Sequence, residues 1–190
     1  MANNHLMSND DMLKIKNLTL APYIQLAISL IDKPRQAGGN TFRHQLDTFT
    51  ILVDYGYCDA VLLKASVIHD VIEDIPGFDQ NIIRNIDNEG NAVLALALEV
   101  SKKVGETKAN FLTRIKNNGS LKAKILKCAD RISNVISLGL VIDLKFVERY
   151  IKETEKYIYP IAEEVNVYML QELKDLVKSR YILLGKEENK

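Results

Sequence analysis

The chain has 190 residues, of which 47% are hydrophobic and 26% are charged, and its formal net charge at pH 7 is +0. This length suits one domain that buries a core without disulfides, and the balanced charge disfavours a protein that binds duplex nucleic acid. No uninterrupted apolar stretch reaches the roughly 20 residues that a membrane-spanning helix needs.

The N-terminal segment MANNHLMSNDD is polar and lacks the apolar stretch of a secretory signal. Residues 1–16 are therefore expected to form a flexible tail, followed by one domain over residues 17–185. The two cysteines, Cys58 and Cys128, show no CxxC spacing and are expected to be reduced thiols. These features together predict a cytoplasmic protein.

Helical periodicity dominates the rest of the chain, and no segment alternates like a strand. Asp59 and Ser120 are expected to cap helices, Pro34–Asn40 reads as a loop, and a kink is expected near Pro160. The fold class is therefore predicted to be all-α. The expected helices, in chain order, are Leu18–Asp32, Thr41–Gly56, Asp59–Ile75, Asp79–Gly90, Asn91–Val104, Ala109–Asn117, Gly119–Gly139, Ile142–Val165 and Val167–Leu184.

The stretch VIHDVIED places four polar groups inside an otherwise apolar helix. At about 100° per residue, His69, Asp70, Glu73 and Asp74 crowd into one arc of roughly 140°. Burying an ionised carboxylate without a partner is costly, so such groups are normally paired or bound to a metal. The stretch is either a solvated helix face or one side of a metal site.

Two further side chains favour the metal site. The chain has only three histidines, and one of them, His44, lies on the preceding expected helix, while Asp130 follows an apolar run downstream. Together with His69 and Asp70 they make a set of two histidines and two aspartates. Mixed nitrogen and oxygen ligands suit Mn²⁺, Fe²⁺ or Zn²⁺, and a bound divalent ion lowers the pKa of water.

The order H…HD…D resembles the pattern of HD-domain metal phosphohydrolases, and the wider sequence resembles the hydrolase domain of RelA/SpoT-type alarmone enzymes. The segments RQAGGNTFRH, HDVIED, LEVSKKV, KCADRISN and IYPIAEEVNVYMLQELKDLVKSRY carry this resemblance, from Arg35 to Tyr181. It implies an HD-domain helical bundle. It also implies removal of the 3′-pyrophosphate from guanosine tetra- or pentaphosphate (ppGpp or pppGpp) with Mn²⁺, as part of a stringent response.

The resemblance also assigns roles around the metal. Glu73 and Asp74 correspond to the family's catalytic pair. Lys127 and Arg131 flank the last ligand and are expected to neutralise the acidic cluster instead of touching substrate. The metal ligands implied by the resemblance are His44, His69, Asp70 and Asp130.

Five residues are candidates for binding the nucleotide. Arg35 corresponds to a family position that packs against guanine, and Asn134 to one that contacts the sugar. Gln36 stands where the family usually has Lys, which keeps hydrogen bonding but loses a charge. Lys102 and Lys103 are candidates for phosphate contacts.

Gln36, and Ser133 in place of the family's usual His, leave the substrate open. One alternative is an HD phosphohydrolase that acts on a nucleoside monophosphate or NADPH. Another is a non-enzymatic alarmone-binding protein, although the complete ligand set argues against it. The chain is too short for both hydrolase and synthetase domains, so hydrolysis without synthesis is expected. The expected partners are a small nucleotide and a cognate alarmone synthetase, without nucleic acid or membrane.

Overall fold

The computed structural model describes residues 7–36 and 38–185, and the predicted all-α fold is confirmed. Across these residues no β-strand forms, and the only β contact is an isolated bridge between Pro34 and Asn40. The helices are α1 (Asn9–Lys16), α2 (Ala21–Ala27), α3 (Thr41–Asp54), α4 (Ala60–Ile68), α5 (Val71–Asp74), α6 (Asn81–Arg84), α7 (Gly90–Val100), α8 (Lys108–Asn118), α9 (Leu121–Ser137), α10 (Leu144–Glu153), α11 (Tyr159–Val165) and α12 (Val167–Leu183), with short turns η1 (Ile28–Leu30), η2 (Leu138–Leu140) and η3 (Thr154–Ile158).

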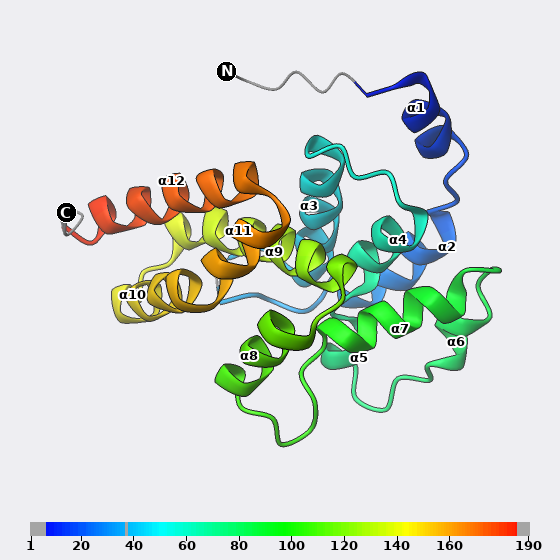
Figure 1. Cartoon of the computed structure of the whole chain (residues 1–190). Helices are drawn as coiled ribbons and strands as arrows, with labels where there is room; N and C mark the ends of the chain where they lie inside the picture. Colours follow the sequence, from blue (N-terminus) through cyan, green and yellow to red (C-terminus); the bar gives the residue numbers. More distant parts are fainter. Residues whose placement is uncertain (1–6, 37, 186–190) are drawn as a thin grey trace.

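Helix α9 is the centre of the bundle, and it packs against α3, α4, α7, α8, α11 and α12 (Figure 1). Its apolar face is fully buried, with Leu126, Ala129 and Ile132 each at 0% exposure. Burying a side chain such as Leu or Ile contributes about 1.5–3 kcal/mol relative to leaving it exposed. Because so many elements pack on α9, the polar side chains that it also buries have fixed positions.

The two predicted helix caps are confirmed, whereas the expected helix Asp79–Gly90 is helical only over Asn81–Arg84 before α7 starts at Gly90. The side chain of Asp59 accepts a hydrogen bond from the Leu62 amide, and the Ser120 hydroxyl accepts one from the Ala123 amide. The expected helix Ile142–Val165 is divided by the π-helical turn η3, and α11 then starts with Pro160 in its first turn. Proline lacks an amide hydrogen, so the regular pattern of backbone hydrogen bonds in the helix changes just before it.

Part of the expected N-terminal tail is helical. Ser8 caps α1, and its hydroxyl accepts a hydrogen bond from the Asp11 amide at 3.1 Å. No residue of α1 is buried, and Figure 1 shows this helix at the periphery of the bundle. Residues 1–6 of the expected tail lie outside the described residues, and the domain range 17–185 stays a prediction. Among the described helices, none combines the length and apolarity required to cross a membrane.

The expected helix Asp59–Ile75 is interrupted at the His69–Asp70 doublet. Helix α4 ends at Ile68 and α5 starts at Val71, while both intervening residues keep right-handed backbone angles. The Asp70 amide lies 3.4 Å from the side-chain oxygen of Gln45 on α3, a tertiary contact that helical spacing cannot predict. The interruption places both side chains of the doublet at the junction of α3, α4 and α9.

Candidate active site

Three buried side chains from three helices form a cluster that can hold a divalent metal ion. His44 comes from α3, His69 from the end of α4 and Asp130 from α9, and they are 2%, 4% and 5% exposed. One ligand atom from each lies within 4.8 Å of the others. The Asp130 Oδ1 atom is 3.0 Å from Nε2 of His44 and 3.8 Å from Nε2 of His69.

The outer ring nitrogens show that this donor set fits a metal. Nδ1 of His69 lies 2.8 Å from the Ser66 carbonyl oxygen, to which it must donate because a carbonyl only accepts. That leaves Nε2 available as a ligand, and it is buried without a hydrogen-bond partner in the described part of the chain. Nδ1 of His44 lies 2.8 Å from the Ser133 hydroxyl. Such outer contacts orient metal-binding imidazoles.

Asp70 lies on the open side of the cluster. Its side chain is 30% exposed, with Oδ1 at 3.6 Å from Nε2 of His69 and Oδ2 at 3.8 Å from Nε2 of His44. Asp70 therefore lies beside the cluster of His44, His69 and Asp130, within 4 Å of both histidines. Asp70 is the most exposed of the four candidate ligands, whereas the other three are buried.

The two cations that flank Asp130 both act on its buried carboxylate, Lys127 through an ion pair and Arg131 through its charge alone. The Lys127 ammonium lies 2.6 Å from Oδ2 of Asp130. Burial alone would raise the pKa of Asp130, but Lys127 and the two histidines hold it well below its usual range. Arg131 instead donates to Glu153 at 2.9 Å.

The two candidate catalytic carboxylates differ in their surroundings. Burial, helped by the nearby charge of Asp70, raises the pKa of Asp74, although Lys33 opposes the shift. The Lys33 ammonium also donates to the backbone carbonyl of Asp74. Glu73 is exposed, and its Oε2 atom accepts a hydrogen bond from the Lys102 amide at 3.0 Å. Asp74 is thus a stronger proton acceptor than an ordinary aspartate.

A cavity of about 410 Å³ opens beside the cluster and collects most of the predicted nucleotide-binding residues. Arg35 donates to Oδ1 of Asn134 at 2.6 Å, and the Asn134 amide in turn donates to Oδ1 of Asp130 at 2.6 Å. Gln36 and Lys102 also line this cavity. Lys103 does not, because it faces a neighbouring cavity beyond Glu73.

The structure adds lining residues that sequence spacing missed. Lys108, Phe111, Phe146 and Tyr150 line the same cavity, and the Lys108 ammonium lies 4.6 Å from the centre of the Tyr150 ring. They come from α8 and α10, which meet the cluster only after folding. No short-range signal distinguishes them from ordinary core and surface residues.

The cavity is suited to a negatively charged ligand once a divalent ion is present. Five cationic and four carboxylate side chains line it, so a bound ion of charge +2 would leave a clear positive excess. Burial and the neighbouring Arg131 lower the pKa of Lys108, although its ion pair with Glu153 at 3.1 Å opposes the shift. The cations are Arg35, Lys102, Lys108, Lys127 and Arg131, and the carboxylates are Asp70, Glu73, Asp74 and Asp130.

Binding of Mn²⁺ is expected to release protons near neutral pH. Burial works against protonation of His69, but Asp70 and Asp130 outweigh it and raise its pKa, so the ring stays protonated to a higher pH than ordinary imidazole. A ligating ring must be neutral, so affinity for Mn²⁺ should fall as pH drops from about 8 to about 6. Titration calorimetry in buffers of different ionisation enthalpy measures this, and a binding enthalpy independent of buffer would contradict it.

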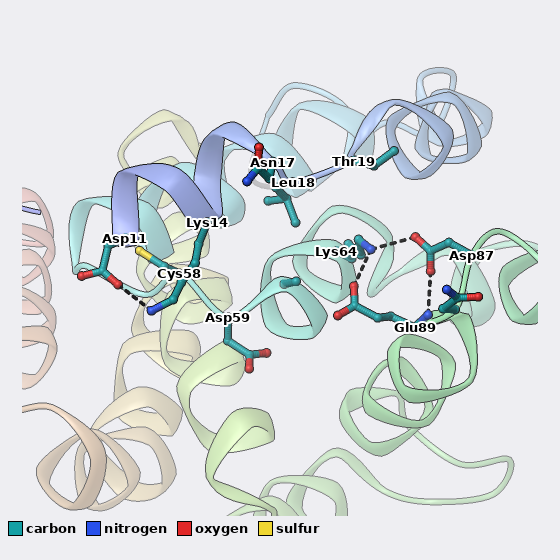
Figure 2. A pocket seen from close by; sticks show the side chains of 12 residues that line it. Asp11, Lys14, Asn17, Leu18, Thr19, Cys58, Asp59, Lys64, Asp87 and Glu89 are labelled. Carbon is teal, nitrogen blue, oxygen red and sulfur yellow. Dashed lines mark hydrogen bonds and ion pairs between the residues drawn. The ribbon is translucent and has the colours of Figure 1, made fainter. Parts of the chain in front are cut away.

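A second cavity, of about 850 Å³, lies beside α1 and α4, away from the predicted site residues. Figure 2 shows Lys64 on its wall between two carboxylates, at 2.7 Å from Asp87 and 2.5 Å from Glu89. Tyr23 also donates to Asp87. The polar groups here satisfy one another and tie α4 to the segment before α7, so we interpret the cluster as structural.

Comparison with known proteins identifies the fold. No family model matches the chain, and no curated protein matches it in sequence. Among solved structures, the chain is similar to a metazoan ortholog of SpoT described as hydrolysing ppGpp and playing a role in starvation responses. The TM-score is 0.72 at 21% sequence identity, over 85% of this chain and 94% of that one. The chain therefore has the all-α HD-domain fold of that ppGpp hydrolase.

Proposed function

We propose that this protein is a metal-dependent phosphohydrolase that removes the 3′-pyrophosphate from ppGpp and pppGpp, leaving GDP or GTP. The observation that carries the proposal is the buried cluster of His44, His69 and Asp130, which opens on a cation-lined cavity beside Glu73 and Asp74. The fold shared with a ppGpp hydrolase supports the choice of reaction.

The residues that would hold the ion are the two histidines with Asp130, completed on the open side by Asp70. A bound divalent ion polarises phosphoryl oxygens and makes water more acidic. Mixed nitrogen and oxygen donors suit Mn²⁺, which is the metal we propose. The contacts of the ring Nδ1 atoms with Ser66 and Ser133 keep both Nε2 atoms turned toward the same point.

The proton acceptor in this scheme is Asp74. Its pKa is raised by burial and by Asp70, which brings its basicity closer to what general base catalysis near neutral pH requires. Glu73 is anchored by the Lys102 amide, and its carboxylate can orient the attacking water. Because the two residues are neighbours on α5, the proton acceptor and the orienting group come from one rigid turn.

The nucleotide would lie across the cavity. The guanidinium of Arg35, held by Asn134 at 2.6 Å, offers a flat face for a base, and Asn134 lies close enough to Asp130 to place a ribose beside the cluster. Lys102 and Lys108 would face the phosphates. Gln36 lines the cavity as an exposed side chain, where it can hydrogen-bond a nucleotide without adding charge.

The test is a substrate panel with the purified chain and Mn²⁺. Release of pyrophosphate and of GDP from ppGpp, abolished by a chelator, is the expected result. GMP, AMP and NADPH form the rest of the panel, and hydrolysis of one of these without any of ppGpp would replace the alarmone with that substrate. Tight binding of ppGpp with no turnover in Mn²⁺, Fe²⁺ or Zn²⁺ would show an alarmone-binding protein instead.

A further inference from the structure

Gln45 makes two contacts with one of the four candidate metal ligands. Its amide nitrogen donates to Oδ2 of Asp70 at 2.8 Å, and its amide oxygen lies 3.4 Å from the backbone nitrogen of Asp70. The Gln45 side chain is completely buried, at 0% exposure. A buried amide whose donor and acceptor both face one residue fixes the position and the direction of that residue.

These contacts lie at the break between two helices. Asp70 lies at the interruption between α4 and α5, and its own side chain does not cap α5. Gln45 follows His44 on α3, and neighbouring positions on a helix point about 100° apart. One turn of α3 therefore places the His44 ring against Asp130 on α9 and the neighbouring Gln45 amide against Asp70.

We propose that Gln45 is a positioning residue of the metal centre, which holds the Asp70 carboxylate toward the ion. This inference rests on the metal site of the proposed function and deepens it. A carboxylate that is 30% exposed would otherwise rotate among several orientations and be drawn toward water. The amide of Gln45 fixes Oδ2, so that Oδ1 stays 3.6 Å from Nε2 of His69.

The alternative is that Gln45 is only a buried polar group that found a partner. The exposure of Asp70 separates the two interpretations. When Gln45 is replaced by Met, which is similar in size and apolar, water can reach Asp70 and replace the lost hydrogen bonds. The fold is then expected to survive, whereas the orientation of the carboxylate is lost. Removing an outer partner of a ligand typically weakens metal affinity by about 10- to 100-fold.

The experiment is a Mn²⁺ titration of the full chain, in which electron paramagnetic resonance measures the free ion. Gln45→Met is expected to raise the Kd for Mn²⁺ by about 10- to 100-fold. Thr48→Val is the matched control, because Thr48 is equally buried on α3 and donates only to the His44 backbone carbonyl. It should leave the Kd unchanged. Gln45→Asn, which is polar but shorter, gives a second test should Gln45→Met not fold, with the same direction of change.

A double-mutant cycle shows whether Gln45 acts through Asp70. In an Asp70→Asn background, adding Gln45→Met is expected to change the Kd by less than about threefold, because the carboxylate to be positioned is gone. An unchanged Kd in Gln45→Met, an equal rise in Thr48→Val, or a full additional rise in the Asp70→Asn background would each overturn the inference. If the unmodified chain itself does not bind Mn²⁺, Zn²⁺ or Fe²⁺, the proposed function fails instead.

Discussion

A chain carrying Glu73→Gln and Asp74→Asn is expected to bind Mn²⁺ as the unmodified chain does and to lose hydrolysis of ppGpp. Neither carboxylate belongs to the buried cluster, so metal affinity should stay within a few-fold. General base catalysis contributes about 10²–10⁴-fold, and kcat should fall by at least that factor. Steady-state kinetics at saturating Mn²⁺, paired with a Mn²⁺ titration of the same preparation, measures both quantities.

The two single variants show how much of the loss in kcat each carboxylate causes. Asp74→Asn removes the carboxylate with the raised pKa and should cause most of the loss in kcat, whereas Glu73→Gln removes the group that the Lys102 amide anchors. Glu163→Gln is the control, because Glu163 is an exposed carboxylate on α11 that does not line the cavity. Retention of more than a tenth of kcat by the double variant would contradict a catalytic role for this pair.

The sequence located the site well because its residue types are rare and their spacing is local. His44 and His69 are two of only three histidines, and the doublet His69–Asp70 is adjacent in the chain. Asp130 was recognisable because it follows an apolar run and stands at the last position of the H…HD…D order. The structure brings these side chains together, and their roles in catalysis stay predictions.

What the sequence missed depends on tertiary contacts. The interruption after Ile68 was not predicted, because the contact of the Asp70 amide with Gln45 joins residues 25 positions apart. Lys103 was grouped with Lys102, although the chain leaves α7 there; Lys102 lines both the cavity beside the cluster and the neighbouring one, whereas Lys103 lines only the neighbouring one. Tyr150 lines the site only because α10 folds back onto α8 and α9, which no periodicity within α10 reveals.

The largest effect on stability is expected from Asp130→Asn. In this variant Lys127 loses the carboxylate at 2.6 Å while its side chain is only 14% exposed. Breaking a buried ion pair by removing one partner costs about 3–5 kcal/mol, because the remaining charge is left without compensation. Urea denaturation in the presence of a chelator measures the free energy of unfolding without any contribution from bound metal. The same variant should also weaken Mn²⁺ binding by more than about 100-fold, beyond the cost of losing an outer partner.

A second substitution separates the loss of stability from the loss of Mn²⁺ binding. Adding Lys127→Met removes the stranded charge but keeps the apolar stem, so Asp130→Asn with Lys127→Met should recover much of the lost stability. It should not recover Mn²⁺ binding, since no carboxylate returns to the side of His44 and His69. If the double variant regained both, Asp130 would be a structural ion-pair partner and not a ligand. Unchanged stability in Asp130→Asn would contradict the prediction. It would mean that water reaches Lys127, and that the surroundings of Asp130 are more open than its 5% exposure indicates.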